Sequence, residues 1–201
     1  TIFLAHGFSK KTGVALVSTF FTLMATGILA VLFVSLTRLS GLGTEDSYLL
    51  QFGPEGLNLQ GLLLGGIIIG TLGVLDDITT AQSAAIFELA RANKKFSMTE
   101  LFSRGMNIGR EHVASLVNTL VLAYAGASLS LFILFVLNPT NQPYWVILNS
   151  ELIIEELVRT LAGSIGLTLA VPLTTILAAF VAFRVYNKPE TKVIGRKFKS
   201  K

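Results

Sequence analysis

The chain of 201 residues has no cysteine and little charge, since only 14% of its residues are Asp, Glu, Lys or Arg. Without cysteine, the chain has no disulfides, thiolate metal sites or cysteine nucleophiles. Soluble domains carry about 25% charged residues, so an ordinary water-facing surface is excluded as well. Hydrophobic residues make up 52% of the chain, and the mean hydropathy is +0.67. Much of the surface must therefore face lipid.

Four apolar segments carry this hydrophobicity. The first, Val14–Thr37, has 24 residues without a charge, enough to cross a hydrocarbon core of about 30 Å at about 1.5 Å per residue. The pattern predicts an all-α, polytopic helical membrane protein whose single transmembrane domain covers residues 1–201. The spans are expected at about residues 14–37, 59–90, 113–137 and 161–183. We also expect an interfacial amphipathic helix near Glu151, and further helices before Thr1–Ala5, which reads like the tail of another apolar segment.

The basic residues are unevenly distributed along the chain. Of the 16 Lys and Arg residues, 14 lie in His6–Gly13, Arg91–Arg110 or Arg184–Lys201. The positive-inside rule places these three segments in the cytoplasm. It predicts a multi-pass protein of the cell membrane with both visible termini cytoplasmic. The expected partner of the basic tail is anionic lipid of the bilayer and not nucleic acid, because no folded basic domain or aromatic platform accompanies it.

The second apolar segment contains two adjacent carboxylates, Asp76 and Asp77. Sixteen uncharged residues, Gln60–Leu75, run into this pair without a turn signal, which predicts one helix with two acids inside the membrane. Ionisable groups at that depth are costly, so function is their default explanation. Desolvation and mutual repulsion oppose a double negative charge, which predicts that the pair holds a proton. The structural alternative is that both carboxylates are hydrated at the inner end of the helix.

Small and polar residues share a broad side of this helix with Asp77, and Asp76 lies at its margin. Such residues allow another helix to approach closely, so the carboxylates are expected to point into a helix–helix seam. The third apolar segment has a narrow polar strip that could face them, formed by Glu111, Ser115, Asn118, Thr119 and Gly126. The predicted proton relay consists of Asp76, Asp77, Asn118 and Thr119. The predicted packing residues are Gly66, Gly70, Gly73, Thr80, Ser83, Ser115 and Gly126.

The chain resembles the YibE/F family of integral membrane proteins in two blocks, GVLDDITTAQSAAIFELARAN (Gly73–Asn93) and NIGREHVASLVNTLVLAYAGASL (Asn107–Leu129). The similarity extends from about His6 to the end of the fourth apolar segment. It implies an integral membrane protein but no particular activity.

A more distant similarity links the chain to one half of the membrane domain of resistance-nodulation-division pumps and of the SecD/SecF proteins. It rests on a glycine-rich helix with an acid in its middle, a basic stretch, and a helix rich in Ser, Asn and Thr. It implies a half-transporter-like bundle with Asp76 or Asp77 as relay carboxylate and Asn118 or Thr119 as the facing polar group. The chain has no large outer domain and no second half, so we expect a homo-oligomer or a paralogous membrane subunit to complete it.

The leading hypothesis is a proton-coupled transport or export component with no enzymatic activity, cofactor or metal. A second is a non-catalytic assembly subunit whose aspartates lock helix packing. A third is a Mg²⁺-dependent membrane transferase, which is less well supported. Magnesium takes an octahedral oxygen shell, and only Glu88 follows the Asp pair on that helix.

Overall fold

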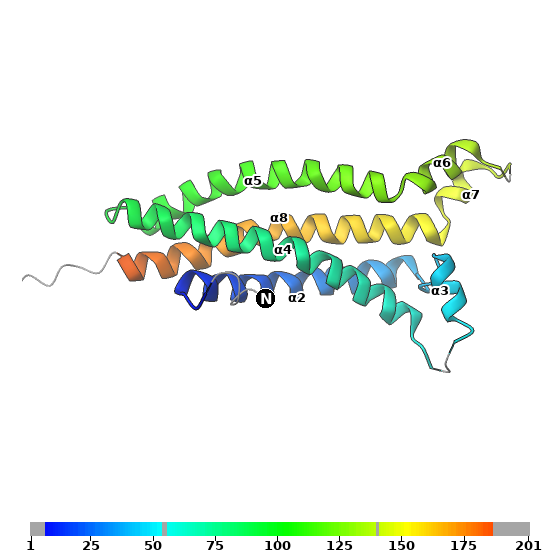
Figure 1. The fold of residues 1–201 in the computed structure, drawn as a ribbon, viewed down its shortest axis with the longest axis horizontal. Coiled ribbons are helices and arrows are strands. Elements are labelled where there is room, and N and C mark those ends of the chain that lie inside the picture. Colours follow the sequence, from blue (N-terminus) through cyan, green and yellow to red (C-terminus); the bar gives the residue numbers. More distant parts are fainter. Residues whose placement is uncertain (1–6, 54–55, 140, 187–201) are drawn as a thin grey trace, which may run out of the picture.

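The computed structural model describes residues 7–53, 56–139 and 141–186. These residues form an all-α fold, with no strand in the described ranges, and this confirms the predicted class. Four long helices run side by side along the long axis in Figure 1: α2 (Lys10–Thr37), α4 (Leu59–Ala92), α5 (Met98–Ala127) and α8 (Glu151–Tyr186). The short helices α3 (Glu45–Leu50), α6 (Leu129–Leu137) and α7 (Tyr144–Leu148) lie at one end. The upstream apolar tail at 1–5 and the basic tail at 187–201 lie outside the described residues.

Local sequence determines where the helices begin. The side chain of Ser9 accepts a hydrogen bond from the backbone N–H of Thr12, so it satisfies a donor that the first turn of α2 leaves unpaired. Ser97 and Glu100 form a reciprocal capping box at the start of α5. The N–H and hydroxyl donors of Ser97 hold the pKa of Glu100 below its usual value. The turn between α4 and α5 is therefore specified by its own polar residues.

α2, α4 and α8 form a three-helix core, and α5 packs across α4 and α8. Two crossings require glycine. A Cβ atom at Gly166 of α8 would lie 2.2 Å from Oγ1 of Thr26 on α2. A Cβ atom at Gly109 of α5 would lie 2.3 Å from Cγ1 of Val171 on α8. Because real Cβ atoms do not approach other atoms so closely, these glycines let a side chain of the neighbouring helix pack directly on the helix backbone.

The third apolar segment is not one straight helix. α5 ends at Ala127, and α6 continues from Leu129 at an angle of 58°. The apolar part of α5, residues 113–127, is about 22 Å long at about 1.5 Å per residue, shorter than a hydrocarbon core of about 30 Å. In the described ranges, α2, α4 and α8 are each long and apolar enough to cross a membrane, and α5 with α6 would make a fourth crossing.

The interfacial helix expected near Glu151 does not exist as a separate element. Glu151 starts α8, which continues without interruption through Pro172 to Tyr186. No Gly or Pro separates Glu151 from the apolar residues that begin at Leu161, so nothing in the sequence ends a helix there. Two exposed aromatic residues, Tyr144 and Trp145, lie on the short helix α7, and such residues are typical of a membrane boundary.

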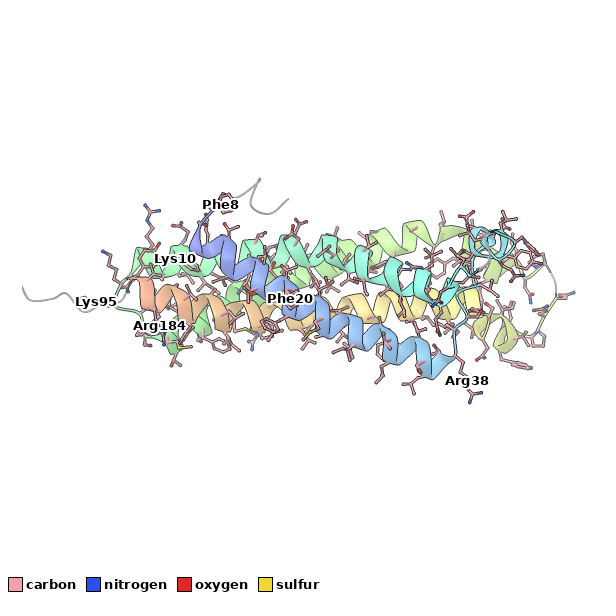
Figure 2. All side chains as sticks on the ribbon, turned by 90° about the horizontal axis from the view of Figure 1, so that it is seen from below. Phe8, Lys10, Phe20, Arg38, Lys95 and Arg184 are labelled. Atoms are coloured by element: carbon pink, nitrogen blue, oxygen red, sulfur yellow. The ribbon has the colours of Figure 1, made fainter. Side chains whose placement is uncertain are left out.

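Charged residues mark the two ends of the bundle. Figure 2 shows Lys10, Lys95 and Arg184 at one end, here called the basic end, and Arg38 at the other, here called the loop end. Between these ends α2 exposes large apolar side chains, among them Phe20, which is 61% exposed. A continuous apolar surface of this kind is suited to contact with lipid.

Replacement of Gly166 by Ala tests the α2–α8 crossing. The new methyl group overlaps Thr26, and overpacking of this kind costs about 1–3 kcal/mol, more than the roughly 1 kcal/mol that Ala gains over Gly in a helix. We expect a lower thermal unfolding temperature in detergent. Gly65→Ala is the matched control, because a Cβ atom there meets nothing within 4 Å. Adding Thr26→Ala to Gly166→Ala should restore most of the stability; a single variant as stable as the control would contradict this packing.

Candidate functional site

The two adjacent aspartates lie in different environments on α4. Asp77 is exposed, whereas Asp76 is partly buried and its Oδ1 atom is fully enclosed. Consecutive residues on a helix point about 100° apart, so one acid can face the bundle while the next faces outward. The hydroxyl groups of Thr79 and Thr80 donate to the backbone oxygen of Asp76 at 3.3 and 2.9 Å. The candidate site is therefore centred on one carboxylate and not on a symmetrical pair.

The glycine side of α4 is open in the described structure. Gly66, Gly70 and Asp77 are all exposed. Cβ atoms at Gly70 and Gly73 would meet nothing within 4 Å, and one at Gly66 would meet only the Arg159 side chain. The predicted seam over Asp77 is thus not formed by any described helix of this chain. Ser83, by contrast, is buried and donates to the backbone oxygen of Lys11 at 2.8 Å, which joins α4 to α2.

The polar strip of α5 does not meet the aspartates within one chain. Ser115, Asn118, Thr119 and Gly126 are exposed, and the hydroxyl of Thr119 donates to the backbone oxygen of Ser115 at 3.2 Å. The apolar side of α5 packs into the bundle instead. Within one chain, the predicted relay residues therefore lie on separate surfaces of α4 and α5. A role of Asn118 and Thr119 in proton transfer stays a prediction.

A row of buried hydroxyl groups, not predicted from the sequence, runs along the inner side of α2. We call it the hydroxyl row; it consists of Ser18, Thr19, Thr22 and Thr26. Thr19 meets Thr79 of α4 with 2.6 Å between the hydroxyl oxygens. The other three hydroxyls donate to backbone oxygens one turn earlier at 2.8–2.9 Å, so their burial leaves no unpaired donor. The helical recurrence of Thr19, Thr22 and Thr26 in an otherwise apolar segment was the available signal.

Gln82 joins three helices at the basic half of the bundle. Its Nε2 donates to the backbone oxygen of Gly105 on α5 and to the hydroxyl of Thr175 on α8, both at 2.8 Å. Its Oε1 and the hydroxyl of Thr174 are buried without a hydrogen-bond partner among the described residues. Buried polar atoms are costly to leave unpaired, so these two oxygens are suited to bind an ordered water molecule or a further hydrogen-bond donor. Gln82 lies six residues beyond Asp76, so it is about 9 Å further along α4.

Two clefts lie beside α5 toward the loop end. One, of about 320 Å³, separates α5 from α4 and α8 and is lined in part by Gly70, Thr71, Tyr124 and Arg159. The other, of about 470 Å³, lies under the α5–α6 bend and is lined mostly by apolar and aromatic residues. No group of three or more His, Asp or Glu side chains suited to a metal occurs in the part of the chain that the structure describes.

Backbone N–H groups bind Glu151 at the loop end. Those of Ser40, Gly41 and Leu42 donate to its Oε1, and the hydroxyl of Ser40 donates to both carboxylate oxygens. Burial alone would raise the pKa of Glu151, but these hydrogen bonds outweigh it and hold the pKa below its usual value. Burial raises the pKa of the neighbouring Glu155, which accepts from the N–H of Gly43 at 3.0 Å. This loop fastens the start of α8 to the end of α2.

Glu151→Gln tests this fastening. Because the folded-state pKa is lowered, the charged contact stabilises the fold above the unfolded pKa, near 4.5, and is lost as the pH falls through the lowered value. We expect the amides of residues 40–42 to exchange faster with deuterium in the variant at neutral pH, and to match the wild type only in acid, after correction for intrinsic rates. Glu156→Gln is the control, since that carboxylate pairs with Arg159 at 3.4 Å. Equal protection at neutral pH would contradict the proposed role of Glu151.

The comparisons with known proteins agree with the architecture. The family model described as YibE/F-like protein matches residues 1–184, which include all seven helices described above except the last two residues of α8. No curated protein and no solved structure matches the chain, and the more distant similarity to resistance-nodulation-division and SecD/SecF proteins has no support from them. With its apolar helices and this match, the chain is a membrane protein and belongs to the YibE/F-like family.

Proposed function

We propose that this protein is a proton-coupled transport or export component in which Asp76 takes up and releases the proton. The observation that carries the proposal is the enclosed Oδ1 of Asp76 on an apolar helix, beside an exposed Asp77. A carboxylate removed from water favours its neutral form unless a partner stabilises its charge. A proton can therefore bind and leave as the helices around Asp76 rearrange.

The groups near Asp76 along α4 are suited to proton transfer. Thr79 follows one turn later and touches Thr19 of the hydroxyl row. Gln82 follows about one further turn on, with a buried oxygen that can accept a hydrogen bond. Hydroxyl groups both donate and accept, so they can hand on protons together with water. Thr79 and Gln82 lie where α4 contacts α2, α5 and α8, so both are covered by neighbouring helices.

The remaining parts of the proposal concern orientation and partners. By the positive-inside rule, the basic end faces the cytoplasm of the cell and the loop end faces outward. No described helix of this chain covers the open side of α4 beside Asp77, so a second copy or a paralogous membrane subunit would supply the other half. Asp77, Asn118 and Thr119 would then act at that contact, since all three are exposed in one chain.

A second candidate function is that of a non-catalytic assembly subunit. The observation that favours it is that most of the hydroxyl row is satisfied by backbone oxygens of the same helix. Such groups serve helix packing without any proton transfer. On this view Asp76 would hold α4 in place, and its loss would affect folding and not activity.

Asp76→Asn and Asp77→Asn form a matched pair for the test, because each replaces a carboxylate by an amide of the same size at one of two adjacent positions. In liposomes containing the purified protein, we expect proton uptake under an imposed membrane potential to be abolished by Asp76→Asn and retained within about twofold by Asp77→Asn. The infrared band of a protonated carboxyl group, followed through a pH titration, should disappear only in the Asp76 variant. Uptake and the infrared band unchanged by Asp76→Asn would refute the proposal. An Asp76 variant that fails to fold, with Asp76→Glu also inactive, would favour the assembly subunit.

A further inference from the structure

We infer that the exposed polar face of α5 is the contact surface for a second copy of this chain. This face, here called the α5 polar face, consists of Arg110, Glu111, Ala114, Ser115, Asn118 and Leu122. The inference rests on the proposed function, which calls for a second subunit, and it names the surface that would bind it. The physical argument itself depends only on α5 lying in the membrane.

In α5 the apolar side chains face the bundle and the polar ones face outward, which is the opposite of a lipid-facing helix. Val113, Leu116 and Leu120 point into the bundle and pack near Leu75 and Leu167. The exposed side of the same turns carries polar groups instead. α2 shows what a lipid-facing surface looks like, since its exposed side chains between the ends are Phe20, Phe21, Met24, Ile28, Val31 and Leu32. The α5 polar face therefore requires cover by protein.

Three side chains of the face have no partner in the part of the chain that the structure describes. Thr119 is satisfied by the Ser115 backbone oxygen, but Asn118 makes no hydrogen bond, and neither Arg110 nor Glu111 makes an ion pair, within residues 7–53, 56–139 and 141–186. Asn118 lies five residues beyond Val113, about 7.5 Å into the apolar segment. An amide at that depth seeks a hydrogen bond across a helix interface.

A second copy fits these unpaired groups. A twofold axis along the membrane normal brings each residue to the depth of its own copy. The Asn118 amide can pair with itself there, since it both donates and accepts. Arg110 and Glu111 are adjacent in sequence, so each can reach the opposite charge of the other chain at the same depth. Ala114 and Ser115 are small enough for the two helices to approach closely.

The absence of native cysteine permits a direct test by disulfide cross-linking in native membranes. We would introduce single cysteines at Ser115 and Leu122, which flank Asn118 on the face, at the inward Val117 and Leu120, and at the lipid-facing Phe20 as control. Copper–phenanthroline oxidation should give a covalent dimer for the two face positions at least fivefold above the other three. No dimer, or equal dimer at all five positions, would overturn the inference. A face covered by another segment or another protein would give that negative result.

The role of Asn118 is tested in the Leu122→Cys background. Asn118→Leu removes a pair of interhelical hydrogen bonds, so we expect association about 3- to 30-fold weaker, whereas Asn118→Gln keeps the amide and should retain most cross-linking. Association unchanged by Asn118→Leu would overturn this part of the inference. Asp76→Asn, which tests the proton-carrying role, should leave cross-linking unchanged. The dimer surface and the proposed transport function can therefore fail separately.

Discussion

In a hydrocarbon layer, each polar group must find its hydrogen bond inside the protein, and the arrangement of this bundle depends on that constraint. The contact between α2 and α4 meets it with Thr19 and Thr79, whose hydroxyl oxygens lie 2.6 Å apart. The Nε2 group of Gln82 meets it toward α5 and α8, whereas its buried Oε1 has no hydrogen-bond partner among the described residues. Because hydroxyl and glycine residues are small, the Thr26 side chain can also pack directly on the backbone of Gly166. Polar satisfaction and tight packing are achieved by the same residues.

The unequal burial of Asp76 and Asp77 follows from this geometry. α4 contacts α2, α8 and α5, so most of its circumference is covered and only one side remains open. Asp77 lies on that open side with the glycines, while Asp76 lies one residue back, toward the covered side. A single step of about 100° along the helix thus separates a carboxylate that water or a partner can reach from one whose oxygen is enclosed. Two adjacent aspartates therefore provide α4 with one exposed carboxylate and one partly buried carboxylate.

Much of the fold could be predicted from the sequence, because long uncharged segments leave few alternatives to helices. The break after Ala127 was harder to predict, since the run from Val113 to Leu137 contains no proline or charge and only Gly126 and Ser128 mark the bend. For the site, helical periodicity identified which residues share a side of α4 but not what covers that side. The glycines were expected beneath a neighbouring helix and are open, whereas Ser83 is buried as a contact to α2. A helix sequence defines its faces, and only the assembled neighbours decide which face is inside.

The contacts that hold the helices together are unevenly distributed along the bundle. α8 is fastened to the end of α2 by the backbone donors around Glu151, and the Thr26–Gly166 crossing holds the middle. α5 is attached through Gly109 and Gln82 toward the basic end, but toward the loop end a cleft of about 320 Å³ separates it from α4 and α8. α5 is therefore in closer contact with the bundle toward the basic end than toward the loop end. Gln82, one of these attachments, lies about 9 Å along α4 from Asp76, so the contact with α5 and the enclosed carboxylate lie within two turns of the same helix.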